Sequence, residues 1–345
     1  MSLETLAVLL LAAGVAALGG GLIAASGPID TVKARSSHVR PTPTGAGLAI
    51  LAGTAIGAAI LAPGAPALAL VMAAAAALGL FGAADDLLDL GAVVKLLAQT
   101  AAALAVVIWG PHVAELPLAP DLTPALGPVL GGAGSALFLL VLVNAVNFMD
   151  GSDGLAVGVA IIAASGLALA SWLAGDAELA SVGAAAAAAG LGFLPWNLRR
   201  RVFQGDAGAF FSALLLGGLG LLMAMRGVAT PYLVVFAFLP LIVDVLLTLI
   251  VRARRGARLG EAHKEHLYQL WLRATERPHL ALAWRVWALT ALTTGLGLAF
   301  EVYAPDWAFA GLMATTVVLS AGWFLTRRKL EGEFQAGTRP LSSRP

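Results

Sequence analysis

The sequence predicts an all-α polytopic membrane protein, and three observations support that prediction. Of the 345 residues, 59% are hydrophobic and only 12% are charged, whereas about a quarter of the residues in soluble domains are charged. The mean hydropathy is +0.89, and no polar stretch is long enough to form a soluble domain. Cysteine is absent, which excludes a disulfide framework and a thiolate metal site.

Apolar segments long enough to cross a bilayer, which takes roughly 17–25 residues, recur along the chain. The first has no basic segment before it and many apolar segments after it, so we expect a helix and not a cleaved signal peptide. The apolar segments predict about ten to eleven transmembrane helices. They cover residues 6–25, 45–63, 66–84, 94–110, 134–149, 154–174, 179–195, 208–225, 230–251, 280–299 and 307–325.

The positive-inside rule orients the predicted helices. If the N-terminus lies outside and the helices alternate, every Lys and Arg except Arg226 falls on the inner side or near the inner end of a helix. The prediction is therefore N-out and C-in, with a single transmembrane catalytic domain over 1–326. The cytoplasmic tail, 327–345, is rich in charge, Gly, Pro and Ser, so we expect it to be disordered.

Polar clusters share the predicted inner face. They are RSSHVRPTPTGAG (35–47), DDLLD (85–89), NAVNFMDGSDG (144–154), QGDAG (204–208) and EAHKEH (261–266). A transporter or flippase, the alternative from a different class, is expected to place ionisable groups near the bilayer midplane. Only Asp244 comes near that description. The arrangement favours an enzyme that acts on a lipid headgroup at the cytoplasmic face.

These clusters suit the chemistry of phosphate. Carboxylate and amide oxygens are the ligands that Mg²⁺ or Mn²⁺ prefers. Glycines beside Asp150, Asp153 and Asp206 let backbone N–H groups approach an anion. If one helix begins at the aspartates, Lys95 lies about two and a half turns beyond Asp86 on that helix. Lys95 would then place one cation beside the metal.

Each polar cluster, considered by itself, also has a purely structural explanation. A cap at the N-terminus of a helix would explain Asp85 and Asp86 alone. The Arg199–Arg201 run is expected to be a topology signal. Asp244 and Arg285 are expected to form a structural ion pair between helices. None of these explanations accounts for several acidic clusters on one face.

Taken in order, the motifs resemble the polyprenyl-phosphate N-acetylhexosamine-1-phosphate transferases. This family includes the enzymes that initiate O-antigen and teichoic-acid synthesis and the phospho-MurNAc-pentapeptide translocase. The resemblance runs from about residue 35 to 269. PTPTGAG is similar to the family's PTP-plus-glycine loop, DDLLDLGAVVKLLAQ to its acid-pair segment and GDAG to its G-D-x-G loop. NAVNFMDGSDGLA is similar to its N-A-x-N-x-x-D-G-x-D-G-L signature, and HKEHLYQ to its histidine loop.

The resemblance implies an enzyme that uses Mg²⁺, with Mn²⁺ as an alternative. By position, Asp85 and Asp86 correspond to the catalytic acid pair. Asn147 and Asp206 correspond to the metal ligands. The implied nucleotide-sugar and diphosphate contacts are Lys95, Asn144, Asp150, Asp153, His263 and His266. The implied partners are a UDP-N-acetylhexosamine, undecaprenyl phosphate and membrane lipids in a bacterial inner membrane, with no nucleic acid and with a homodimer left open.

The sequence departs from the family pattern at several positions. Ala209 stands where the family has Ser, and Ala46 interrupts the glycine run. The histidine loop has two separated His instead of three in a row, and Asp89 replaces a Lys expected of the translocase. These last two differences favour O-antigen-type initiation from UDP-GlcNAc or a UDP-6-deoxy-HexNAc, with the translocase as the alternative.

Overall fold

The computed structural model describes residues 2–30, 41–64, 66–258, 260 and 263–335. Three stretches of the predicted motifs and tail, 35–40, 261–262 and 336–345, lie outside these residues.

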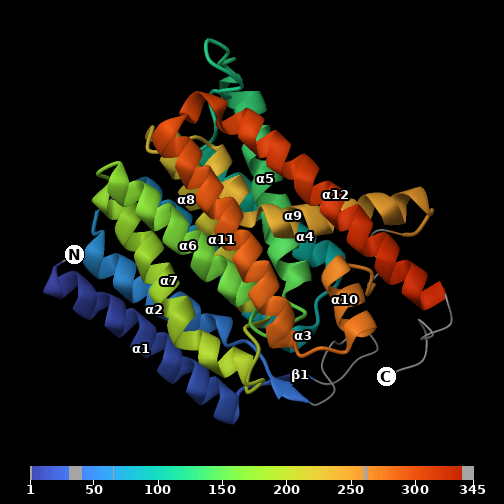
Figure 1. The fold of residues 1–345 in the computed structure, drawn as a ribbon. Helices are drawn as coiled ribbons and strands as arrows, with labels where there is room; N and C mark the ends of the chain where they lie inside the picture. Colours follow the sequence, from blue (N-terminus) through green and yellow to red (C-terminus); the bar gives the residue numbers. More distant parts are fainter. Residues whose placement is uncertain (1, 31–40, 65, 259, 261–262, 336–345) are drawn as a thin grey trace.

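The described chain is a helical bundle (Figure 1). Each of the predicted spans overlaps one helix. Among the residues that the structure describes, ten helices are long and apolar enough to cross a membrane, and α2, of 15 residues, is shorter. This confirms the all-α polytopic fold, while its orientation in the membrane stays a prediction. The elements are α1 Leu3–Ser26, β1 Ile29–Asp30, β2 Thr42–Pro43, α2 Gly47–Leu61, α3 Pro66–Leu88, α4 Ala92–Trp109, α5 Gly127–Met149, α6 Leu155–Leu173, α7 Ala177–Leu198, α8 Gly205–Met225, α9 Tyr232–Arg254, α10 Leu267–Thr275, α11 His279–Tyr303, η1 Pro305–Trp307 and α12 Ala308–Gln335.

The last helix continues beyond the predicted boundary at residue 326. The described part of the expected tail, 327–335, is helical and not disordered. The reason is burial: Leu330 packs against Leu270 of α10, and Arg327 is 4% exposed. Arg327 also donates a hydrogen bond to the carbonyl of Glu265, at 3.0 Å. The end of α12 is therefore part of the folded bundle.

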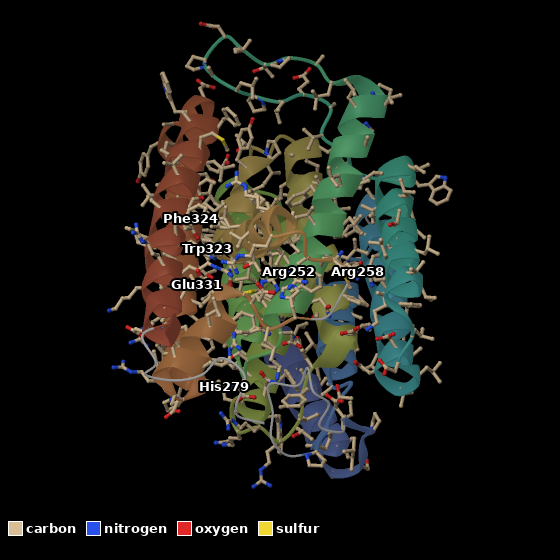
Figure 2. The ribbon with its side chains drawn as sticks, turned by 90° about the vertical axis from the view of Figure 1, so that its right-hand side faces the viewer. Arg252, Arg258, His279, Trp323, Phe324 and Glu331 are labelled. Atoms are coloured by element: carbon tan, nitrogen blue, oxygen red, sulfur yellow. The ribbon has the colours of Figure 1, made fainter. Side chains whose placement is uncertain are left out.

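The predicted ion pair between Asp244 and Arg285 is wrong. Arg285 donates to the carbonyl of Ala281 in its own helix. Its guanidinium lies 4.9 Å from the centroid of the Trp271 ring, where the ring's negative face attracts a cation. Asp244 instead accepts a hydrogen bond from the indole of Trp323, which Figure 2 labels on α12. The buried carboxylate therefore links α9 to α12 and not to α11.

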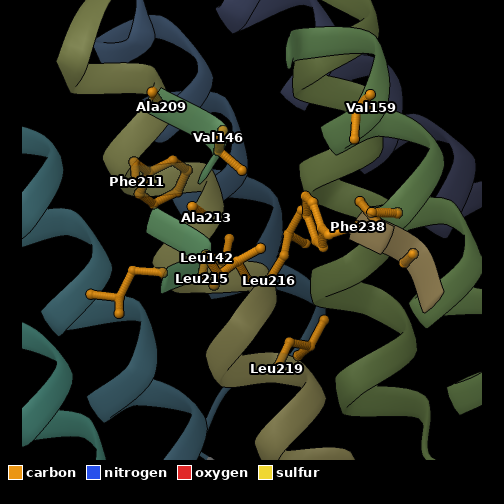
Figure 3. Packing of buried hydrophobic residues seen from close by; sticks show 14 of the residues in the cluster. Leu142, Val146, Val159, Ala209, Phe211, Ala213, Leu215, Leu216, Leu219 and Phe238 are labelled. Atoms are coloured by element: carbon orange, nitrogen blue, oxygen red, sulfur yellow. The ribbon is translucent and has the colours of Figure 1, made fainter. Parts of the chain in front are cut away.

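The central helix of the bundle is α8. Every residue from Ala207 to Met223 is buried, and its side chains pack against α5, α6 and α9 (Figure 3). An apolar helix surrounded by other helices has no freedom to shift without disturbing close packing. Because Asp206 lies in the first turn of α8, this helix gives the acidic side chain a rigid base.

Candidate active site

Asp206 is the centre of a polar cluster at one end of the bundle. Its Oδ1 accepts a hydrogen bond from Asn147 Nδ2 at 2.7 Å. Its Oδ2 accepts one from Lys95 Nζ at 2.9 Å, and Lys95 also forms an ion pair with Asp85. The structure therefore brings together four of the residues singled out in the sequence, from α3, α4, α5 and α8.

Asp86 caps the N-terminus of α8 from a neighbouring helix. Its Oδ1 accepts from the backbone N–H of Asp206 at 3.0 Å, and its Oδ2 from that of Ala207 at 3.4 Å. Helix N–H groups in the first turn lack partners within the helix, and a negative charge is favourable there. The capping explanation is thus correct for Asp86, but the capped helix is α8 and not the helix that carries the acid pair.

Lys95 reaches the acids from a different helix than the sequence suggested. The condition of one helix that begins at the aspartates and includes Lys95 is not met, because α3 ends at Leu88 and α4 begins at Ala92. Asp89 between them has a φ of 51°, a left-handed conformation that ends the helix. Asp85 Oδ1 accepts from the N–H of Leu90 at 2.9 Å and fixes this turn. The turn folds Lys95 back onto the acids.

The PTPTGAG loop holds the segment that leads into α8. Phe203 donates its N–H to the Pro43 carbonyl at 2.8 Å and accepts from the N–H of Ala46 at 3.1 Å. Gly47 then donates to the Gln204 carbonyl at 2.9 Å. Ala46 has an ordinary right-handed conformation, φ −71°, so its place in the glycine run causes no strain. This loop therefore sets where the first turn of α8 begins.

Asn144 lies one turn before Asn147 on α5. Its Nδ2 donates to Gln99 Oε1 and to the Leu140 carbonyl, each at 2.8 Å. Gln99 is buried and lies one turn after Lys95 on α4. The Asn144 amide therefore connects α4 and α5 one turn away from Lys95 and Asn147. Its predicted contact with the nucleotide-sugar substrate stays a prediction.

Asp150 and Asp153 point to different partners. Asp150 Oδ1 accepts from Nε2 of Gln204, two residues before Asp206 in the chain, at 2.7 Å. Burial raises the pKa of Asp150 well above the usual range of an aspartate, against the opposing effect of the Gln204 hydrogen bond. Asp153 Oδ2 lies 2.6 Å from Arg200 Nε and 2.9 Å from His279 Nδ1.

Arg200 and His279 were not singled out as site residues in the sequence. Arg200 has a φ of 56° after the end of α7, and His279 is the first residue of α11. Within the described part of the chain, the Asp153 carboxylate pairs with Arg200 and His279 and not with a residue that contacts Asp206. The basic run that was expected to be only a topology signal thus supplies a partner for Asp153.

The rings of His263 and His266 lie against each other, with their centroids 4.8 Å apart. Burial lowers the pKa of both side chains to about 4, so both are neutral at pH 7. His266 is 3% exposed, and its ring lies 5.8 Å from that of Phe148. Because Phe148 directly follows Asn147, the histidine pair approaches the cluster from the end of α5.

The oxygen donors of the cluster are of the kind that a divalent cation prefers, although among the described residues no group of three or more His, Asp or Glu side chains is arranged to hold a metal ion. Asp85 and Asp206 both pair with the ammonium of Lys95, and Asp86 accepts from the backbone N–H of Asp206, so these four side chains bring three carboxylates to one ammonium. Carboxylate oxygens are suitable ligands for Mg²⁺. Asn147 now presents its amide nitrogen to Asp206, so binding through its oxygen requires that the amide turn over.

Known proteins share this region of the chain. Residues 68–224, from α3 to α8, match the family model described as glycosyl transferase family 4. A decaprenyl-phosphate N-acetylglucosaminephosphotransferase of Mycolicibacterium smegmatis is 30% identical over 275 residues, which cover 70% of this chain and 68% of the relative. The protein of that name from Mycobacterium tuberculosis is 32% identical over 278 residues, with the same coverage of 70% and 68%.

A second kind of relative matches over a shorter region. The phospho-N-acetylmuramoyl-pentapeptide-transferase of Mycobacterium tuberculosis is 33% identical over 202 residues, 51% of this chain. The chain spans about half of that relative's length, 53%.

Proposed function

The chain belongs to the polyprenyl-phosphate hexosamine-1-phosphate transferases of glycosyl transferase family 4, and on that premise we propose the reaction it catalyses. It transfers an N-acetylhexosamine-1-phosphate from a UDP-sugar to a polyprenyl phosphate and releases UMP. The single observation that carries this proposal is the convergence of Asp85, Lys95, Asn147 and Asp206 at one end of the bundle. A relative that acts on decaprenyl phosphate, as its name states, supports the class of acceptor.

The proposed reaction is a direct in-line displacement. A phosphate oxygen of the lipid attacks the phosphorus that carries the sugar, a new P–O bond forms, and the bridging P–O bond to UMP breaks. A phosphomonoester has a second pKa of ~6, so the acceptor is already largely dianionic at pH 7. It needs positioning and relief of charge repulsion more than a strong base.

The cluster supplies that positioning and charge relief. Lys95 offers an ammonium to the diphosphate, and Asp85 orients it. Asp86 holds the backbone of Asp206, which fixes the carboxylate at the start of α8. Asp206 and Asn147 would hold the Mg²⁺, with Mn²⁺ as the alternative, and the cation would neutralise charge on the diphosphate and on the leaving UMP.

A two-step reaction through a phosphosugar–aspartate intermediate is the competing mechanism. The direct reaction is favoured because both candidate nucleophiles are already engaged: Asp86 by two backbone N–H groups and Asp85 by Lys95 and Leu90. Mass spectrometry of enzyme incubated with donor and Mg²⁺ but no lipid distinguishes the two. A stoichiometric adduct on an aspartate would refute direct transfer and leave the family assignment intact.

For the substrate we propose a UDP-GlcNAc or UDP-6-deoxy-HexNAc donor and a role in O-antigen-type initiation. In the transfer step, Asp85 or Asp86 of the predicted acid pair would also orient the acceptor or remove its residual proton. The histidine loop HKEHLYQ and Asp89 support this choice of donor. The coverage of the GlcNAc-phosphotransferases, 68% of their length, also supports it over the translocase. The translocase stays the second candidate because of the 33% identity over 202 residues. Rescue of a translocase-depleted strain by this gene would favour that candidate.

The proposed location is a bacterial inner membrane with the cluster facing the cytoplasm. The distribution of Lys and Arg supports this orientation. The chain has no cysteine, so single cysteines can report it directly. Asp121→Cys, in an exposed loop after α4, should react with an impermeant thiol reagent on intact cells, and Arg277→Cys only after permeabilisation. The reverse pattern would contradict the orientation.

A further inference from the structure

Asp244 is a buried carboxylate with four hydrogen-bond donors around it. Its Oδ1 accepts from the N–H of Leu267 at 2.8 Å, from Trp323 Nε1 at 2.9 Å and from Thr248 Oγ1 at 3.2 Å. Its Oδ2 accepts from the N–H of Tyr268 at 3.4 Å. Asp244 is 6% exposed. A carboxylate so deeply buried is costly unless it is hydrogen-bonded, and these four donors supply hydrogen bonds to both oxygens of Asp244.

Two of those donors are the first residues of α10. Leu267 and Tyr268 open the helix, and His266 is the residue directly before it. Their N–H groups have no partner within the helix, and a negative charge at this end is favourable. Asp244 therefore caps α10 from α9 and fixes the point at which the histidine loop meets the helix.

Helix α12 supports the same loop from the other side. Trp323 holds Oδ1 of Asp244, and Arg327 donates to the carbonyl of Glu265 at 3.0 Å. The Glu265 carboxylate forms an ion pair with Arg252 of α9. In Figure 2 Trp323 and Arg252 lie at the same level of the bundle, on α12 and α9. These contacts lie outside residues 68–224, which match the family model.

From α10 two contacts reach Phe148 at the end of α5. Tyr268 Oη donates to the carbonyl of Phe148 at 3.1 Å, and the His266 ring lies 5.8 Å from the Phe148 ring. Phe148 is the neighbour of Asn147, whose amide contacts Asp206. A shift of α10 would therefore move His266 relative to the end of α5.

We propose that Asp244 is a positioning residue of the transfer reaction, which caps α10 so that His266 and Tyr268 lie against the end of α5 beside the acidic cluster. Trp323 keeps the carboxylate in place for this task. The inference rests on the proposed function, because it assigns the histidine loop a part in turnover.

A double-mutant cycle tests the proposal. Asp244→Asn, His266→Ala and the double variant are purified, and kcat/KM for the UDP-sugar is measured on monodisperse protein. If Asp244 acts through His266, the losses in kcat/KM of the two single variants do not multiply in the double variant. Each single variant should lose at least about tenfold in kcat/KM, and the double variant should lose no more than about threefold beyond the worse single variant.

The matched control is Glu301→Gln. Glu301 is a partly buried carboxylate in α11 that accepts two hydrogen bonds from Thr230, next to the start of α9. It lies at the end of the bundle away from the histidine loop. Its replacement should leave kcat/KM within about threefold of the wild type, because it removes a carboxylate of the same kind without touching α10.

The outcomes separate the inference from the proposed function. Asp244→Asn activity near wild type, or losses that multiply in the double variant, would overturn the positioning role while the enzyme stays a transferase. If Asp244→Asn does not fold, Trp323→Phe replaces it in the same cycle, with the same criteria. If the wild type forms no product, the proposed function fails first. In that case, amide hydrogen exchange at Leu267 and Tyr268 still tests whether Asp244 caps α10. Exchange should be faster in Asp244→Asn and unchanged in Glu301→Gln.

Discussion

Replacing Gly82 by alanine should separate the acid pair from Asp206 without unfolding the protein. Gly82 lies on the face of α3 that touches the first turn of α8. A Cβ at this position would lie 2.6 Å from the backbone carbonyl of Asp206 and 2.7 Å from the N of Ala207. These are backbone atoms of a buried helix, so no side chain can rotate away to make room.

The expected magnitudes follow from that distance. Carbon atoms in good contact are about 3.5–4.0 Å apart, so the two helices must separate by about 1 Å. Overpacking of this kind costs about 1–3 kcal/mol, and the exchange of a helical Gly for Ala returns roughly 0.5–1 kcal/mol. Because a displacement of about 1 Å can cost about 100-fold in rate, activity should fall far more than stability.

The assay compares Gly82→Ala with Gly134→Ala, a helical glycine in α5 whose added Cβ would meet nothing within 4 Å. Turnover and the thermal unfolding midpoint are measured for both variants in detergent. Gly82→Ala should lose about 100-fold in kcat and only several degrees in midpoint, while Gly134→Ala keeps wild-type activity. Activity of Gly82→Ala within about threefold of the wild type would refute the tight α3–α8 contact as the source of site geometry.

Three further predictions concern single side chains. Asp206→Asn should abolish turnover at every pH, because it removes the carboxylate proposed to hold the metal; Mg²⁺-dependent activity in this variant would contradict its role. Lys95→Met leaves Asp85 and Asp206 without their shared cation. The measured kcat/KM should fall at least about 30-fold, which corresponds to the loss of one charged hydrogen bond of ~2 kcal/mol. Lys95→Arg keeps the positive charge and should retain more of the wild-type kcat/KM than Lys95→Met. Burial lowers the pKa of His266 from 6.5 to about 4. Between pH 6.5 and pH 4 the unfolded chain therefore binds a proton at His266 that the folded protein does not bind. Stability should therefore fall as the pH drops from 6.5 towards 4, by about 2 kcal/mol at pH 5, and His266→Gln should flatten the pH dependence of the unfolding midpoint.

The helices and the meeting of the acids could be predicted from the sequence. Apolar segments of membrane length give the spans directly, and the positive-inside rule puts the polar ends on one side. Asp85, Asn147 and Asp206 end or begin such spans on that side. Helix ends that lie on the same side of a compact bundle are close in space, so the sequence could predict that these three side chains meet.

The partners of individual side chains could not be predicted. Spacing placed Lys95 on the helix of Asp86 because it gave no weight to a left-handed Asp89, φ 51°. The Leu-Asp-Leu-Gly turn is a signal that would have separated the two helices. Asp244 was paired with Arg285 by charge alone, whereas its donors are uncharged backbone and indole N–H groups. Such contacts depend on how α9, α10 and α12 pack, which no local pattern in the chain encodes.

The most direct test of the account is the transfer reaction itself. Purified protein is incubated with Mg²⁺, a polyprenyl phosphate and a panel of UDP-N-acetylhexosamines, and lipid products and UMP are quantified together. The account predicts a lipid diphosphate carrying the sugar and an equal amount of UMP with at least one donor, both absent from Asp206→Asn. Neither product with any donor, or uptake of the substrate into liposomes without a covalent product, would contradict it.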